Sequence, residues 1–207
     1  MAALPPSRPD LGNEPHDPAL SARAMENLAY IRETMEQAGA FTAVPGWGGV
    51  AMGVTALIAA YVASRQPTDH TWLRVWLIEA VLGTAIAAAT MVWKSRAVSV
   101  PLLSGPGRKF ALAFAPPILA GALLTASYAR HALLPALPAV WLLLYGAGVV
   151  AGGSFSVRVV PVMGFCFMAT GVVALFTPPG WRDVLMAIGF GLFHIVFGVV
   201  IARKHGG

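Results

Sequence analysis

The most regular feature of the chain is a series of long apolar segments separated by short polar links. About 20 residues at ~1.5 Å per residue form a helix that crosses a hydrocarbon core of roughly 30 Å. We expect transmembrane helices at residues 47–64, 72–93, 110–128, 134–152, 155–176 and 181–202. The pattern therefore predicts an all-α integral membrane protein, built as a bundle of six transmembrane helices over residues 40–205.

The segment from Trp72 to Lys94 shows this pattern most clearly. Trp72 and Trp76 stand near one end and Trp93 near the other, as the aromatic belts of a membrane helix do. Lys94 and Arg96 follow directly, which is typical of a cytoplasmic boundary. We expect the other five helices to pack around this one.

Two segments precede the predicted bundle. Residues 1–20 are polar and rich in proline, which predicts a disordered tail. Residues 21–39 favour a short cytoplasmic amphipathic helix, whose apolar seam follows the 4, 3, 4, 3 spacing of a coiled coil. We interpret this helix as folded against the protein's own cytoplasmic loops. The alternative is that Ala22–Ala38 binds a second copy or another protein.

The basic residues predict the orientation. With the N-terminus in the cytoplasm, ten of the 14 Lys and Arg residues lie on the inside and four on the outside. The excess predicts that both termini are cytoplasmic. We expect a multi-pass protein of a bacterial-type inner (plasma) membrane.

Composition excludes several functional classes. The chain is 57% hydrophobic and 11% charged, whereas a soluble domain carries about 25% charged residues. The net charge of +5 is spread between apolar segments, so we expect the lipid bilayer as partner and no nucleic acid. Cys166 is the single cysteine, so no internal disulfide can form, and we interpret it as an inert buried thiol. GxSxG and HExxH motifs are absent, which favours a non-enzymatic protein without a cofactor.

Glu79 is the one acidic residue well inside a predicted span. A carboxylate in hydrocarbon is costly, and intramembrane acids commonly serve proton or ion pathways. We consider two interpretations. Glu79 is either a proton-linked carboxyl group or an acid that lies close enough to the outer surface to reach water or Arg74.

His194 is predicted near the membrane midplane, and Tyr145 at a similar depth. We favour a neutral histidine that hydrogen-bonds to Tyr145 or to a threonine hydroxyl on another helix. The alternative is a proton relay or a ligand-binding group, for which Glu79, His194 and Tyr145 are the candidates. A second midplane histidine is missing, which argues against haem. His70 and His131 are weak candidates for a metal site at the outer edge.

Small residues predict where helices approach closely, because glycine lets two backbones come together in lipid. The candidates are three pairs, at Gly49 and Gly53, at Gly148 and Gly152, and at Gly191 and Gly198. Gly146–Gly152 also imitates a dinucleotide-binding fingerprint, but it lies inside an apolar span without a preceding strand.

The stretch from Glu79 to Thr84 (EAVLGT) resembles the first helix of small multidrug-resistance transporters. In that family a lone membrane glutamate exchanges protons for hydrophobic cations. The resemblance covers only this short stretch, is displaced by one position, and falls in the second span instead of the first. We therefore do not assign the chain to that family.

Three functional hypotheses follow. The first is a non-enzymatic membrane protein that acts in assembly, regulation or partner binding through Ala22–Ala38 and glycine-lined helix faces. The second is a proton-coupled carrier of a small, mostly apolar solute that uses Glu79, with help from His194 and Tyr145. The third is a metal- or haem-binding redox component. Polar groups are scarce within the spans, and this scarcity places the hypotheses in that order.

Overall fold

The computed structural model describes residues 22–23, 25–28, 30–31, 44–97 and 105–205. The described residues between 22 and 31 are helical. The predicted tail and most of the predicted amphipathic helix lie outside the described residues, so both stay predictions. The bundle that begins at Gly46 is described below by itself.

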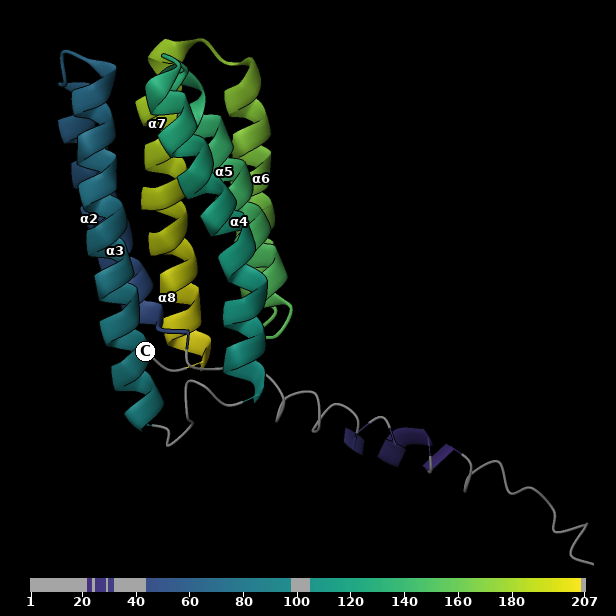
Figure 1. Ribbon diagram of the computed structural model, residues 1–207. Helices are drawn as coiled ribbons and strands as arrows, with labels where there is room; N and C mark the ends of the chain where they lie inside the picture. The colour runs from purple at the N-terminus through teal and green to yellow at the C-terminus, as the bar shows by residue number, and fades with distance from the viewer. Residues whose placement is uncertain (1–21, 24, 29, 32–43, 98–104, 206–207) are drawn as a thin grey trace, which may run out of the picture. The chain divides into compact units, whose positions relative to one another are not determined.

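The membrane part is helical throughout (Figure 1). In chain order its elements are α2 (Gly46–Ser64), α3 (Asp69–Ala97), α4 (Gly105–Arg130), η1 (Leu134–Ala136) with α5 (Leu137–Gly153), α6 (Val159–Phe176), η2 (Pro179–Trp181), α7 (Arg182–Met186), η3 (Ala187–Phe193) and α8 (His194–His205). The last four elements form one continuous span. Six helices of the described chain are long and apolar enough to cross a membrane, which confirms the all-α six-helix bundle.

Several helix boundaries differ by a few residues from those that the sequence predicts, and among the starts those of the fifth and third spans differ most. The fifth span begins at Val159 instead of Phe155, because the backbone N–H groups of Phe155 and Ser156 bond back to Gly152 and Gly153 in a turn. The third span begins five residues before the predicted Phe110, at Gly105. Pro106 fits there, because the first turn of a helix has no use for its missing N–H group.

The helices are arranged in two groups (Figure 1). One group contains α2, α3 and the last span, and the other contains α4, α5 and α6. The last span also contacts α5 and α6, so it joins the two groups. Sequence order is therefore not followed in space, since the last span returns to pack beside the first.

Glycines bring the last span against α2. A Cβ atom added to Gly53 would stand 2.6 Å from the carbonyl oxygen of Gly191, and one added to Gly198 would stand 2.7 Å from that of Gly46. Real Cβ atoms do not come so close to backbone, so only glycine fits at these positions. Gly46 also lies against Ala202, which places the start of the first span and the end of the last span at the same end of the bundle.

A second glycine contact joins α5 to α6. A Cβ atom added to Gly146 would lie 2.7 Å from Gly164 O, and one added to Gly164 would lie 2.8 Å from Gly146 O. Gly148 and Gly152 face the other neighbour, α4, where the nearest atoms belong to Phe114 and Phe110. One face of α5 thus packs against α6, and another face packs against α4.

The expectation that the second span lies at the centre of the bundle is wrong. α3 packs mainly on α2, and much of its surface is exposed. Its one glycine within the span, Gly83, makes no close backbone contact. The last span takes the central position instead, because Gly189 meets Leu142 of α5 while Gly191 meets Leu57 of α2.

The predicted aromatic belt is corrected at one end of α3. Trp72 and Trp76 are 1% and 8% exposed, so they belong to the core and do not face lipid headgroups. Trp93 is exposed, as is Trp47 near the same end of the bundle, and Trp181 is exposed at the other end. These three tryptophans are the ones that suit the two membrane surfaces.

We predict that Gly53→Ala destabilises the bundle, because its methyl group would overlap the backbone of the last span. The expected loss is about 1–3 kcal/mol, the usual cost of overpacking. Thermal unfolding in detergent, followed by circular dichroism, measures it. Gly180→Ala is the control, since nothing lies within 4 Å of its added Cβ atom. Equal stability of the two variants would contradict the close contact.

Candidate functional site

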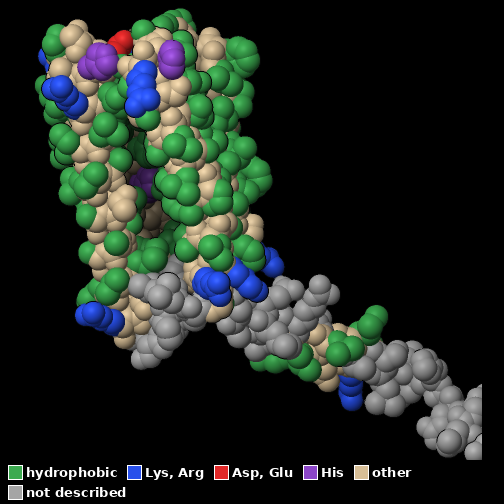
Figure 2. Space-filling view, viewed as in Figure 1, with side chains coloured by type: hydrophobic (Ala, Val, Ile, Leu, Met, Phe, Trp, Pro, Cys, Tyr) green, Lys and Arg blue, Asp and Glu red, His purple; other side chains and the backbone are tan. Residues whose placement is uncertain are grey.

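A cavity of about 290 Å³ lies between α3, the last span and the group of α4 and α5. Leu77, Ala80 and Thr84 of α3 line it and are themselves exposed, so the cavity opens sideways between α3 and α4. Figure 2 shows the corresponding hollow along this face of the bundle, with a histidine visible in its depth. Lys and Arg side chains of the bundle gather near its two ends in this view. The opening lies between these two charged ends, along the part of the bundle that would face the interior of a bilayer.

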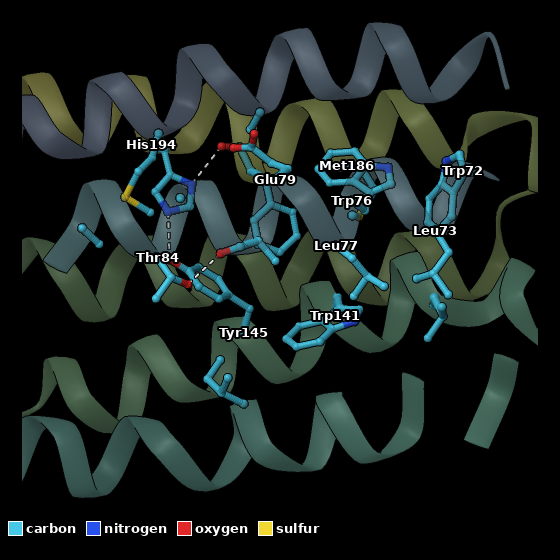
Figure 3. A pocket seen from close by; sticks show the side chains of 18 of the residues that line it. Trp72, Leu73, Trp76, Leu77, Glu79, Thr84, Trp141, Tyr145, Met186 and His194 are labelled. Atoms are coloured by element: carbon cyan, nitrogen blue, oxygen red, sulfur yellow. Dashed lines mark hydrogen bonds between the residues drawn. The ribbon is translucent and has the colours of Figure 1, made fainter. Parts of the chain in front are cut away.

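The cavity wall is mostly aromatic and aliphatic. Figure 3 shows Trp72 and Leu73 at one end and His194, Tyr145 and Thr84 toward the other. An apolar wall with a few convergent polar groups is the usual form of a small-molecule site.

His194 and Tyr145 form a hydrogen-bonded pair in this wall. The Tyr145 hydroxyl lies 2.8 Å from His194 Nε2, and His194 Nδ1 lies 2.9 Å from the carbonyl oxygen of Phe190. A carbonyl oxygen only accepts, so Nδ1 carries the hydrogen of the neutral ring. Nε2 then accepts from the Tyr145 hydroxyl. The contact that the sequence favours between these residues is therefore present, and it fixes the tautomer of the imidazole.

The last span is irregular just before this histidine. Ala187–Phe193 is π-helical, and the backbone N–H of His194 bonds to Gly191 O. The carbonyl oxygen of Phe190, within this irregular segment, accepts from the imidazole side chain. π-Helical turns widen a helix and are frequent at functional sites. Here the turn places both Phe190 and His194 in the cavity wall.

Aromatic rings hold the pair in place. The ring of Tyr145 packs 4.9 Å from Phe167, 5.1 Å from Phe190 and 5.8 Å from Phe114, between ring centroids. His194 is 5% exposed. The histidine and tyrosine are therefore rigid parts of the wall, and their rings cannot turn without repacking three helices.

Glu79 borders the same cavity, but its carboxyl group is held by another helix. Its Oε1 atom lies 2.8 Å from the hydroxyl of Thr55 in α2. That hydroxyl also lies 2.9 Å from Met52 O, although it has only one hydrogen to donate. Both bonds form at once when Glu79 is protonated and donates to Thr55. The hydroxyl of Thr55 can thus pair with the carboxyl group in either protonation state.

The other partners considered for Glu79 are not the ones found. No described bond joins it to Arg74 or to His194. Glu79 also borders a shallow groove on the outer side of the α2–α3 pair, together with Thr55 and Ile58. Its carboxyl group therefore lies between two apolar hollows, one inside the bundle and one on its surface.

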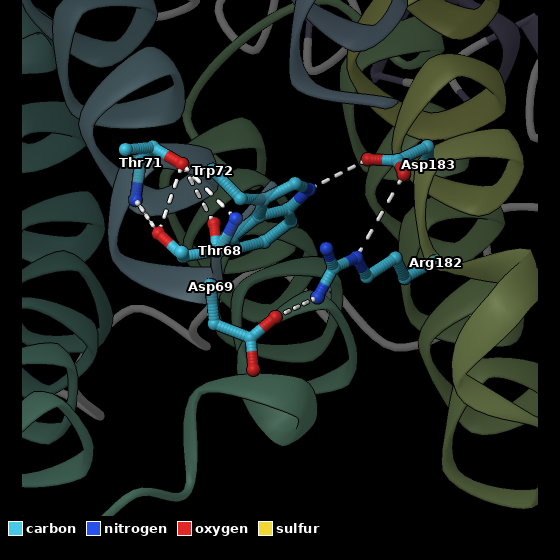
Figure 4. A network of polar contacts seen from close by, with 6 residues as sticks. All are labelled: Thr68, Asp69, Thr71, Trp72, Arg182 and Asp183. Carbon is cyan, nitrogen blue, oxygen red and sulfur yellow. Dashed lines mark hydrogen bonds and ion pairs between the residues drawn. The ribbon is translucent and has the colours of Figure 1, made fainter. Parts of the chain in front are cut away.

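A polar network fastens the Trp72 end of the cavity (Figure 4). Trp72 Nε1 donates to Asp183 Oδ1 at 2.6 Å, and Arg182 forms an ion pair with Asp69 at 2.5 Å. The guanidinium of Arg182 also lies 4.8 Å from the centroid of the Trp72 ring, in a cation–π contact. The network joins α3 to α7 and closes this end of the cavity.

Three tryptophans line the cavity, and their indole N–H groups differ. Trp72 donates to Asp183, and Trp141 donates to Thr125 Oγ1 at 2.9 Å. Trp76 Nε1 is buried without a hydrogen-bond partner, and it is the one such side-chain atom among the described residues. An unpaired buried donor costs about 1–3 kcal/mol, so the exception calls for an explanation.

The weaker candidates lie elsewhere. His70 and His131 are exposed, and His131 Nδ1, just after the end of α4, bonds to Ser127 O in the last turn of that helix. Among the described residues, no group of three or more His, Cys, Asp or Glu side chains could hold a metal ion. Cys166 is a free, partly buried cysteine.

Comparison with known proteins gives no assignment. No protein-family model matches the chain, and no curated protein or solved structure matches it either. The interpretation of the cavity therefore depends on its own geometry.

Sequence reasoning missed Thr55, Trp141 and the network around Arg182 and Asp183. Thr55 gives little signal, because a threonine in a helix usually bonds to its own backbone. The network could have been anticipated from opposite charges at Asp69 and Arg182, which both flank predicted spans on the same side.

We predict a measurable coupling between Tyr145 and His194. A double-mutant cycle with Tyr145→Phe and His194→Leu should give about 1 kcal/mol, within the range of hydrogen bonds between membrane helices. Unfolding in mixed micelles provides the four free energies. A cycle of Tyr61→Phe with His194→Leu is the control, because Tyr61 is 63% exposed and should give no coupling. Equal values in both cycles would refute a specific bond.

Proposed function

We propose that this polytopic membrane protein is a carrier that binds a small, mostly apolar molecule in the cavity beside Glu79. The observation that carries the proposal is the apolar cavity of about 290 Å³ that opens between α3 and α4. A molecule dissolved in the bilayer reaches such an opening without entering water. The proposal corresponds to the second of the hypotheses drawn from the sequence.

The place of the cavity supports transport as well as binding. It lies at the junction of two helix groups, and carriers bind solutes where two such groups meet. α3 and α4 line it from opposite groups and make at most marginal contact with each other. Movement of one group against the other would widen or close the opening without breaking the glycine contacts inside each group.

Glu79 is the proposed proton-coupling group. It borders the cavity, and its bond to Thr55 is compatible with both a neutral and an ionised carboxyl group. Solute that enters the cavity displaces water beside this carboxyl group and thereby changes the relative stability of its two protonation states. His194 and Tyr145 act as fixed parts of the wall in this proposal.

The other two hypotheses have less support. Partner binding or homo-oligomerisation through Ala22–Ala38 concerns a segment that lies largely outside the described residues, and it stays a prediction. A redox role would need metal or haem ligands, for which His70 and His131 are poorly placed, since each is exposed on a different loop or helix end.

We also propose the orientation that the basic residues predict, with the N-terminus and the C-terminus of the chain both in the cytoplasm of a bacterial-type cell. The links after α2, α4 and α6 would then face outward, and the link after α5 would face inward. The larger number of Lys and Arg residues supports the cytoplasmic assignment of the inward end.

The cavity is tested with fluorene, a flat hydrocarbon, in lipid nanodiscs. By equilibrium dialysis, we predict saturable binding in excess of that to empty nanodiscs. Binding should also exchange protons between the protein and the solution, measured as a pH change in a weakly buffered medium. Gly83→Leu should abolish binding, because the nearest atoms to its added Cβ atom lie 3.8 and 3.9 Å away and the side chain would extend into the cavity. Glu79→Gln should retain binding and abolish proton exchange.

Ala88→Leu is the matched control, since it introduces the same leucine side chain at an exposed position of the same helix, away from the cavity. It should bind fluorene as the natural protein does. Binding that survives Gly83→Leu would refute the cavity as the site. Unchanged proton exchange in Glu79→Gln would refute the coupling role alone.

Labelling of single cysteines tests the orientation. In a Cys166→Ser background, we predict that Ser64→Cys reacts with an impermeant maleimide in intact cells, because the α2–α3 link faces outward. Ser154→Cys, in the α5–α6 link, should react only after permeabilisation. Both serines are exposed, so access to the reagent depends on the side of the membrane. The reverse result would invert the proposed topology.

A further inference from the structure

The unpaired indole of Trp76 indicates what the cavity is built to hold. Trp76 lines the cavity, its side chain is more than nine-tenths buried, and its Nε1–H has no acceptor. The two neighbouring tryptophans in the wall each have an acceptor supplied by the protein, Asp183 for Trp72 and Thr125 for Trp141. The fold thus satisfies every indole of this wall except the one at Trp76.

We propose that the ligand is an uncharged, mostly apolar molecule that carries a hydrogen-bond acceptor oxygen, such as a carbonyl group, and that this oxygen accepts from Trp76 Nε1–H. The proposal rests on the proposed function and narrows it to a chemical class. A plain hydrocarbon would fill the cavity and leave the indole unpaired. A carbonyl compound of the same shape would fill it and supply the missing acceptor.

The rest of the wall restricts the class further. No Lys or Arg side chain lines the cavity, and His194 accepts from Tyr145 in its neutral form, so an anionic ligand has no counter-charge. Glu79 contributes acceptor oxygens, and its Oε1 atom pairs with the hydroxyl of Thr55 in α2. Trp76 is therefore the one donor in the described wall that is uncommitted, and it selects for an acceptor.

Packing fixes where that donor is presented. The ring of Trp76 lies 6.2 Å from that of Trp72 and 6.1 Å from that of Phe190, between centroids, and it is tilted against both. Figure 3 shows Trp76 between the Trp72 end of the cavity and Glu79. A ligand held here would place its oxygen toward the Trp72 end and its apolar body toward Tyr145 and His194.

The test compares fluorene with 9-fluorenone, which has the same rings and a carbonyl group in place of the methylene group. Equilibrium dialysis with protein-containing and empty nanodiscs corrects for the partitioning of each probe into lipid. We expect fluorenone to bind about fivefold more tightly than fluorene, as one added neutral hydrogen bond gives. Trp76→Phe removes the N–H group but keeps an aromatic ring, and it should reduce the ratio to about one.

Trp141→Phe is the matched control, because it makes the same chemical change in the same cavity at an indole that already has an acceptor. It should retain the preference for fluorenone. The infrared carbonyl band of bound fluorenone gives a second measurement. The band should lie at lower frequency in the natural protein and in Trp141→Phe than in lipid alone, because a hydrogen bond weakens the C=O stretch.

The outcomes separate this inference from the proposed function. If neither probe binds above empty nanodiscs, the cavity is not a ligand site and both proposals are overturned. If both probes bind equally in the natural protein, with no displacement of the carbonyl band, the cavity binds apolar molecules without regard to an acceptor oxygen. The inference about Trp76 is then overturned. Should Trp76→Phe fail to fold, the affinity ratio and the band position in the natural protein still decide the inference.

Discussion

Close contact between glycine backbones is the constraint on which this bundle depends. In lipid the hydrophobic effect does not drive helices together, so they associate where small residues let backbones meet. Gly53 with Gly191 and Gly46 with Gly198 hold α2 to the last span, and a similar contact holds α5 to α6. α3 lacks such a contact with α4, and the cavity lies at that junction. The hollow is therefore a direct consequence of where the glycines are and where they are missing.

The same constraint explains how far the sequence could be interpreted. Length and hydropathy are local properties, and they located the six spans to within a few residues. Which helices become neighbours depends on which helix faces meet. An apolar segment gives little indication of which of its faces contacts another helix. The central place of the last span was consequently missed, although its glycines at 191 and 198 had been singled out. The position of Trp72 and Trp76 in the core was missed for the same reason, because a tryptophan near the end of a span suits a belt or a core equally well.

The candidate site was predictable only in part. The hydrogen bond between His194 and Tyr145 followed from their similar depth, since a buried histidine in lipid needs a partner and few polar groups lie at that level. The partner of Glu79 did not follow from depth, because Thr55 is one of several hydroxyl groups on neighbouring helices. The unpaired state of Trp76 could not be predicted at all. It depends on the acceptors that neighbouring elements bring, or fail to bring, to one indole.

The network of Asp69, Arg182, Trp72 and Asp183 closes one end of the cavity, whereas the side between α3 and α4 is open. If the proposed ligand site is correct, the protein would respond to the amount of a compound dissolved in the surrounding bilayer and not directly to its aqueous concentration. Hydrophobic compounds accumulate in membranes far above their concentration in water. Even a weak affinity for the compound in the bilayer would therefore correspond to half-saturation at a low aqueous concentration. Selectivity measured from the aqueous side would then combine two separate quantities, the solubility of each compound in lipid and its fit against the protein.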